Sequence, residues 1–393
     1  DLIVGAYGAN SKVGKTYVVF GKNNTDAINL SAITSGTGGF VINGEGLNDW
    51  SGWSVSSAGD VNGDGLDDVI VGATNVNVGK GRSYVVFGKK DDTSAINLGV
   101  ITSGTGGFAI NGDARVDGSG YSVSSAGDVN GDGLDDLIVG TDDTQFNDKA
   151  QIGKSYVVFG KTNGTAINLG DIARGTGGFI INGETTTNNS DTSVSSAGDV
   201  NGDGLDDLIV RTHSVDSDNN NGFSNESGKS YVVFGKIDTD VINLSAIASG
   251  TGGFAINGEK ASDKNVFSVS YAGDVNGDGL DDVIVGARLD NGGKGASYVV
   301  FGKTDNTAVN LGTIARGTGG FVINGEKTGD NSGYSVSAAG DINSDGLDDL
   351  IVGADSANGG KGKSYVIFGK TDTKAINLSA LGDDSKYIID HQG

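Results

Sequence analysis

The sequence contains no cysteine and only two histidines, His213 and His391, in 393 residues. Without cysteine, no disulfide bond stabilises the fold and no thiol serves as a nucleophile. No serine lies in a Gly-x-Ser-x-Gly sequence either, which excludes the nucleophile elbow of the α/β-hydrolases. The residues on which nucleophilic catalysis usually depends are therefore scarce or missing.

The chain also lacks long apolar runs and is poor in basic residues. No stretch is long and apolar enough to span a bilayer, so we expect no direct membrane insertion. The 27 lysines and arginines stand against 50 aspartates and glutamates, giving a formal net charge of −23. Because nucleic acids and anionic membranes bind basic faces, neither is expected as a partner.

What the chain has instead is one acidic loop in five copies. The first copy covers residues 60–68 and reads Asp-Val-Asn-Gly-Asp-Gly-Leu-Asp-Asp, and the others begin at Asp128, Asp199, Asp274 and Asp341. Only the fifth copy differs, at Ile342 and Ser344, and neither position is one where a metal would need a side chain. The chain is built from repeats, and five of them carry this loop.

The spacing of the loops predicts the fold class. Intervals of 67 to 75 residues are too long for a two-stranded solenoid turn and suit a unit of four short strands with loops. Each interval repeats four apolar segments bounded by turn residues, such as Tyr121–Val129, Leu137–Val139, Ser155–Gly160 and Gly178–Ile181. Helical periodicity is weak, and the stretch 28–33 and its copies predict a single turn. We therefore predict an all-β fold, a β-propeller of four-stranded antiparallel blades.

The repeats divide the chain into six blade units. Residues 1–393 are predicted to form a single propeller domain with blades at approximately 1–51, 52–119, 120–190, 191–265, 266–332 and 333–393. The small residues of 54–59 and its copies indicate the innermost strand, where blades converge. Residues 1–6 align with 68–73, the second strand of a blade, so the first unit lacks its inner strand.

The loop chemistry indicates a divalent cation. Carboxylates, an amide and a carbonyl on a flexible loop are hard oxygen ligands, which favour calcium over the smaller magnesium ion. Gly65 and its copies provide the sharp turn between ligands. Two carboxylates about 4 Å apart repel by roughly 4 kcal/mol at an effective dielectric near 20, so the loop needs a cation. The alternative is an acidic surface turn, since Asn-Gly and Asp-Gly form good hairpins alone. Asp67, at the eighth position, is predicted to be solvated and not a ligand.

The aromatic-Ser-Val strand, the Asp-x-Asn-x-Asp-Gly-x-x-Asp loop and the following Asp-Leu/Val-Ile-Val-Gly-Ala strand resemble the FG-GAP repeat of integrin α-subunit propellers and their bacterial relatives. The resemblance covers essentially the whole chain, and the family's seven blades keep a seven-bladed ring possible. It implies about five Ca²⁺ ions, each held by loop positions one, three, five, seven through its main-chain carbonyl, and nine. In this sequence those positions are Asp60, Asn62, Asp64, Leu66, Asp68, Asp128, Asn130, Asp132, Leu134, Asp136, Asp199, Asn201, Asp203, Leu205, Asp207, Asp274, Asn276, Asp278, Leu280, Asp282, Asp341, Asn343, Asp345, Leu347 and Asp349.

Calcium loops of this type indicate an extracellular setting. Extracellular modules bind calcium at about 0.1 to 1 mM, and cytosolic calcium would leave such sites empty. We therefore expect a secreted or cell-surface protein whose signal peptide is missing from the given chain. The connections opposite the metal loops vary most, namely 48–51, 141–152 and 212–227, and the integrin resemblance implies ligand binding there.

Two functions from different classes remain open on the sequence alone. The first is a non-enzymatic, calcium-stabilised propeller for adhesion, recognition or cell-surface assembly, with a protein or glycan ligand. The alternative is the propeller of a secreted carbohydrate-active enzyme, a polysaccharide lyase or hydrolase, because acidic pairs for such chemistry are abundant. Trp50 has no counterpart in the other repeats and is a candidate contact, whereas Trp53 matches Tyr121, Phe267 and Tyr334 and is predicted to be a core position.

Overall fold

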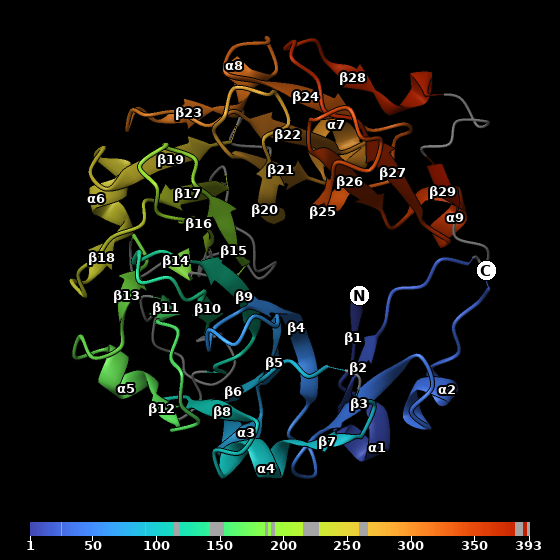
Figure 1. The fold of residues 1–393 in the computed structure, drawn as a ribbon. Coiled ribbons are helices and arrows are strands. Elements are labelled where there is room, and N and C mark those ends of the chain that lie inside the picture. Colours follow the sequence, from blue (N-terminus) through green and yellow to red (C-terminus); the bar gives the residue numbers. More distant parts are fainter. Residues whose placement is uncertain are drawn as a thin grey trace. The chain divides into compact units, whose positions relative to one another are not determined.

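The computed structural model describes residues 1–24, 26–90, 92–113, 118–141, 153–184, 188–189, 193–214, 228–258, 266–381 and 388–390. It confirms the predicted all-β architecture of repeated blades, and each blade is an open sheet (Figure 1). The chain divides into two compact units, residues 1–182 with 237–242 and residues 183–236 with 243–393. The first three sheets lie in the first unit and the last three in the second.

Five blades follow the predicted order of four antiparallel strands, and the first blade has the second, third and fourth of them. The first strands, which precede the acidic loops, are β4 (Ser51–Gly59), β9 (Ser122–Gly127), β15 (Val194–Gly198), β20 (Ser268–Gly273) and β25 (Ser332–Gly340). The second strands are β1 (Leu2–Ala6), β5 (Asp68–Ala73), β10 (Asp136–Gly140), β16 (Asp207–Ser214), β21 (Asp282–Ala287) and β26 (Asp349–Ala354). The third strands are β2 (Lys15–Val19), β6 (Arg82–Val86), β11 (Lys154–Val158), β17 (Lys229–Val233), β22 (Ala296–Val300) and β27 (Lys363–Ile367). The fourth strands are β3 (Gly39–Asn43), β8 (Gly107–Asn111), β13 (Gly178–Asn182), β19 (Gly253–Asn257), β24 (Gly320–Asn324) and β29 (Ile388–Asp390).

A short parallel strand, which the sequence did not predict, extends the outer edge of five sheets. These strands are β7 (Ile96–Asn97), β12 (Ile167–Asn168), β18 (Ile242–Asn243), β23 (Val309–Asn310) and β28 (Ile376–Asn377). Each comes from the next repeat, so that Ile96 pairs with Ile42 of the preceding blade. A further two-residue strand, β14 (Asn188–Asn189), pairs with β16. Within each unit, the parallel pairing ties consecutive blades together at their outer edges.

The helices are single turns, as the weak helical periodicity predicts. Those between third and fourth strands are α2 (Leu30–Thr34), α4 (Leu98–Thr102), α5 (Leu169–Ile172), α6 (Leu244–Ala248), α8 (Leu311–Ile314) and the 3-10 turn η1 (Leu378–Ala380). Those between second and third strands are α1 (Ala9–Lys12), α3 (Val76–Gly79), α7 (Asp290–Gly293) and α9 (Ala357–Gly360). No helix in the described part of the chain is long and apolar enough to cross a membrane.

The core lies between neighbouring blades, because both faces of the second and third strands are covered. All six residues of β5 are buried, and Ile70 pairs with Val85 of β6. Blade contacts are close enough to require glycine, since a Cβ on Gly72 would lie 2.1 Å from the carbonyl oxygen of Gly120 in the next blade. The alternation of small and branched residues in these strands is thus a consequence of blade stacking.

The first strands lie at one edge of their sheets, as predicted for the strand where blades converge. In the first unit β4 contacts β1 and β9, and in the second unit β20 contacts β15 and β25 (Figure 1). The first sheet has the order β1-β2-β3-β7 and contains no inner strand, which confirms the prediction for the first blade unit. Its second strand is accordingly more exposed, with Leu2 65% accessible where the matching Val69 is 9% accessible.

Candidate metal centre

Each acidic loop is curved by its own first aspartate. In the first loop Asp60 Oδ1 accepts hydrogen bonds from the backbone N–H groups of Gly63 at 2.8 Å and Asp64 at 3.0 Å, and Oδ2 accepts one from Gly65 at 2.8 Å. The loops that begin at Asp128, Asp199 and Asp274 repeat all three bonds. Since a carboxylate oxygen has two lone pairs, these bonds leave Asp60 able to bind a cation as well.

The ninth position places a carboxylate inside the protein. Asp136, Asp207, Asp282 and Asp349 are 0% accessible and Asp68 is 1% accessible. Asp68 Oδ1 accepts a hydrogen bond from Gly88 N at 2.7 Å, and Asn62 Nδ2 lies 3.2 Å from Oδ2. In the part of the chain that the structure describes, no lysine or arginine forms an ion pair with any of these five carboxylates. The buried carboxyl groups therefore have hydrogen-bond partners but no lysine or arginine partner among the described residues.

This environment changes the acidity of the ninth aspartate. Burial raises the pKa of Asp68 to about 7, with a further increase from the Asp64 carboxylate. Burial likewise raises the pKa of Asp136, Asp207 and Asp282 to about 8. Desolvation and like charge both oppose ionisation, and a bound cation would reverse both effects.

The fifth loop contains the clearest unmatched ligand atom. Asn343 occupies the third position, and its Oδ1 is buried without a hydrogen-bond partner. In the other four loops the matching amide contacts the ninth aspartate through Nδ2, an orientation that depends on assigning the nearly equivalent amide nitrogen and oxygen. An unpaired buried oxygen beside carboxylates fits a hard cation such as calcium.

The predicted ligands of each loop stay together in the fold, but they do not form a ready-made carboxylate cluster. Among the described residues, no group of three or more Asp, Glu, His or Cys side chains is arranged to hold a metal ion. Two of the five predicted ligands are an amide and a main-chain carbonyl, so each loop contributes only three ligand carboxylates.

The repeats also match a known family. The FG-GAP repeat model matches residues 51–86, 119–158, 192–233, 268–300 and 332–367, each spanning a first strand, its acidic loop and the next two strands. The chain contains five FG-GAP repeats. Two curated relatives are integrin alpha-5 of Xenopus laevis, 27% identical over 227 residues, and integrin alpha pat-2 of Caenorhabditis elegans, 30% identical over 243 residues.

These alignments cover 55% and 60% of this chain but only 19% and 18% of the relatives. The chain therefore spans less than a fifth of the length of either integrin relative. The shared part supports an FG-GAP β-propeller that resembles the N-terminal domain of integrin α-subunits.

The eighth FG-GAP loop position has a role that the sequence did not predict. Asp67 is exposed, as expected, but its counterparts Asp135, Asp281 and Asp348 are half-buried. The Oδ2 atom of Asp135 accepts a hydrogen bond from Asp60 N, in the loop of the preceding blade, at 2.7 Å. The prediction of a solvated neighbour was therefore wrong for these three copies, because the carboxylate reaches a loop more than 70 residues away in sequence.

The candidate contact Trp50 belongs to an aromatic cluster in the first unit. Its ring stacks on Trp53 at a centroid distance of 5.6 Å, and Trp53 lies 4.9 Å from Tyr7 and 5.6 Å from Tyr121. Trp53 is therefore a half-buried member of a surface cluster and not a fully buried core residue. Trp50 has a left-handed φ of 59°. The matching residue in the sixth blade is Asn331, which is also left-handed.

Other sequence candidates lie partly or wholly outside the described residues. These are His391 and nearly all of the variable connections 141–152 and 212–227. Arg211 continues β16 and pairs with Ser230 of β17, so the second strand of the fourth repeat is eight residues long.

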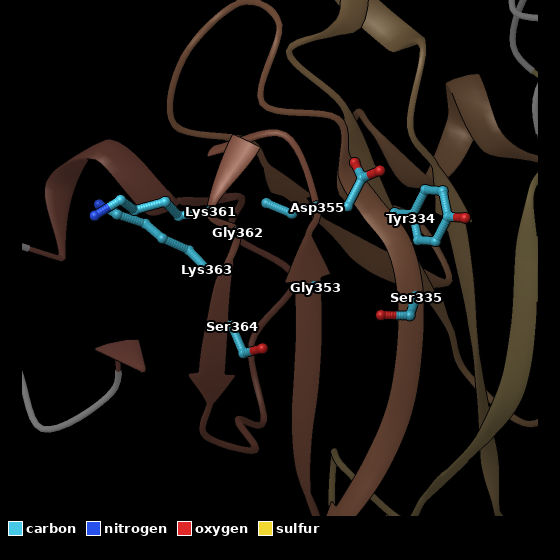
Figure 2. A pocket seen from close by; sticks show the side chains of 9 residues that line it. Tyr334, Ser335, Gly353, Asp355, Lys361, Gly362, Lys363 and Ser364 are labelled. Carbon is cyan, nitrogen blue, oxygen red and sulfur yellow. The ribbon is translucent and has the colours of Figure 1, made fainter. Parts of the chain in front are cut away.

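A cavity of about 330 Å³ lies on the sixth blade. Figure 2 shows Gly353 in its wall, with Tyr334 and Asp355 on one side and Lys361 and Lys363 on the other. In the fifth blade a Cβ on Gly286, which matches Gly353, would lie 2.2 Å from the Gly333 carbonyl of the next blade. In the fifth blade the corresponding surface is covered by the sixth blade.

Proposed function

We propose that this protein is a non-enzymatic, calcium-stabilised FG-GAP propeller of the extracellular space or cell surface. The observation that carries the calcium assignment is the buried ninth aspartate, which has hydrogen bonds but no cationic partner in the described part of the chain. The unpaired Oδ1 of Asn343 supports it independently. Bound calcium would supply the positive charge that lets these carboxylates ionise together.

The proposed ligands are the first, third, fifth, seventh and ninth positions of each loop. Free calcium at one to ten times the dissociation constant would stabilise each site by roughly 0.4 to 1.4 kcal/mol. Over five sites this is about 2 to 7 kcal/mol, which is comparable with the net stability of a domain. Because dissociation constants of extracellular modules are about 0.1 to 1 mM, this stabilisation requires extracellular calcium.

We further propose that a protein or glycan ligand binds the face opposite the calcium loops. Two residues in the first unit support this. Trp50 has φ 59° and Val78 has φ 62°, a left-handed conformation that costs side-chain-bearing residues about 1 to 2 kcal/mol. The matching residues in the sixth blade are Asn331 and Gly359, which adopt this conformation at lower cost. Strained side chains on loops are typical of a surface maintained for binding.

The calcium assignment is tested by thermal unfolding in excess calcium, in excess magnesium and in chelator, together with metal analysis of the purified chain. We expect a calcium-specific rise in melting temperature and about five ions per chain. No shift and no bound metal would mean that the loops are acidic turns and would remove the main support for the proposal.

The binding face is tested with the substitution Trp50→Asn, which introduces the residue found at the matching position of the sixth blade. Binding to cell surfaces and to a glycan array is measured for both proteins in calcium. We expect the variant to fold with unchanged calcium content and to lose binding. Equal binding by the two proteins would place the ligand contact elsewhere.

A further inference from the structure

The eighth aspartate of one FG-GAP loop holds the loop of the preceding blade. In the first unit Asp60 N donates to Asp135 Oδ2 at 2.7 Å, and Asp135 N donates back to the Asp60 carbonyl at 3.2 Å. The second unit repeats this pair twice. Asp199 N donates to Asp281 Oδ2 at 2.9 Å and Asp274 N to Asp348 Oδ2 at 3.0 Å, each with a returning backbone bond of 3.2 Å.

Glycine in the held loop and a backbone hydrogen bond from the next blade both favour this contact between loops. A Cβ on Gly59, Gly198 or Gly273, just before the held loop, would lie 2.2 Å from the incoming carboxylate. Gly340 precedes the fifth loop, and a Cβ there would meet nothing within 4 Å. The neighbouring backbone adds a third bond, from Lys161 N to the Val61 carbonyl at 2.7 Å. The held loop is therefore fixed at its first two residues by the next blade.

The position of the eighth aspartate links two candidate calcium sites. Asp135 lies between Leu134 and Asp136, which are proposed ligands of its own loop. Its carboxylate holds the backbone of Asp60, the first proposed ligand of the preceding loop. An ion bound by Leu134 and Asp136 would restrict Asp135, and a restricted Asp135 would keep Asp60 in place for the second ion.

We propose that Asp135, Asp281 and Asp348 are positioning residues that couple neighbouring calcium loops, so that calcium in one blade raises the affinity of the preceding loop. This inference rests on the proposed calcium function and assigns these residues no direct metal contact. Coupling free energies between binding sites are reciprocal, so each loop of a pair should strengthen the other by the same factor. Typical coupling of this kind changes affinity about 5- to 150-fold.

The test uses the 393-residue chain and a calcium titration followed by hydrogen exchange and mass spectrometry of peptides that contain single loops. Asp135→Glu keeps the charge but displaces the carboxylate. We expect the midpoint for residues 60–68, the calcium concentration that gives half of their protection from exchange, to rise about tenfold. Asp67→Asn is the control, because Asp67 is exposed and its carboxylate accepts no hydrogen bond among the described residues. It should leave the midpoint of every loop nearly unchanged.

A second substitution tests the coupling itself. Asp132→Ala removes a proposed ligand from the loop 128–136, and it should also raise the midpoint of residues 60–68 by the same tenfold factor. If Asp135→Glu unfolds the chain, Asp281→Glu provides the same test on the loop 199–207 in the second unit. Wild-type midpoints for residues 60–68 in both Asp135→Glu and Asp132→Ala would overturn the coupling and leave the calcium proposal intact. No calcium-dependent protection in the wild-type chain would overturn both.

Discussion

The substitution Asp64→Asn should change the sign of its effect on stability when calcium is added. Asp64 is an exposed carboxylate whose Oδ1 accepts a hydrogen bond from Leu66 N at 3.0 Å. Asparagine keeps an oxygen for that bond and removes one negative charge. That charge contributes to the raised pKa of the buried Asp68, after the larger effect of burial.

The magnitudes follow from the two states of the loop. In chelator, removing a like-charge neighbour should stabilise the chain by about 0.5 kcal/mol, since partly exposed charge pairs contribute 0.2 to 1 kcal/mol. In calcium at ten times the dissociation constant, losing a ligand should remove about 1.4 kcal/mol of binding free energy. For a folded body of 150 to 250 residues, 1 kcal/mol corresponds to roughly 2 to 4 °C. The melting temperature should therefore rise by about 1 to 2 °C in chelator. In calcium the net loss is about 0.9 kcal/mol, and the melting temperature should fall by about 2 to 4 °C.

The assay is thermal unfolding followed by circular dichroism in both buffers, with Asp67→Asn as the matched control. Asp67 belongs to the same loop and carries the same charge, but it is not a proposed ligand. Its substitution should have the same sign in both buffers. If Asp64→Asn behaves like Asp67→Asn in calcium, Asp64 binds no ion and the proposed ligand set is wrong.

Three further outcomes are expected. Calcium affinity should fall as the pH is lowered from 9 to 6, because burial raises the pKa of Asp136, Asp207 and Asp282 to about 8. The fall should be at most about tenfold per pH unit for each competing proton. Calorimetric titration at several pH values checks this, and a pH-independent affinity would contradict it. Burial raises the pKa of Glu326, but hydrogen bonds from Tyr365 and Lys363 outweigh it and bring the pKa down to about 2. The stability from this group is present above the unfolded pKa of about 4.3 and is lost as the pH falls through the folded pKa of about 2. Glu326→Gln should therefore destabilise by roughly 1 to 3 kcal/mol at pH 7 and by much less below pH 2 in urea unfolding. Val78→Gly should stabilise the folded chain by about 0.5 to 1 kcal/mol, because Val78 is 71% exposed with φ 62°. The reverse substitution at a matching position, Gly292→Val at φ 75°, should destabilise it. Equal urea midpoints for the variants and the wild type would show that the left-handed conformation carries no strain.

Much of the fold follows from local sequence. The short β-branched runs, the turn residues between them and the loop spacing of 67 to 75 residues predict a four-stranded blade, because these signals act between residues near one another in the chain. The missing inner strand of the first sheet was likewise predicted from the alignment of residues 1–6 with 68–73. The FG-GAP resemblance was visible in the same residues and is confirmed by the five matched segments.

The candidate calcium loops are also a local property. All five proposed ligands of a loop lie within nine consecutive residues, so their spacing is fixed before any tertiary contact forms. The loop curvature that Asp60 imposes through Gly63, Asp64 and Gly65 is local for the same reason. Whether calcium binds stays a prediction, which metal analysis will decide.

Contacts between blades were decided only by the tertiary structure. The parallel Ile96–Asn97 strand and the bond from Asp60 N to Asp135 Oδ2 both depend on how one repeat stacks on the next. In a chain of near-identical repeats, Asp67 and Asp135 look the same, although one is exposed and the other holds a neighbouring loop. The sequence determines the strands and loops of each blade, because these arise from neighbouring residues. Stacking determines which of the identical side chains bind another blade, because their partners are backbone atoms that leave no pattern in the sequence.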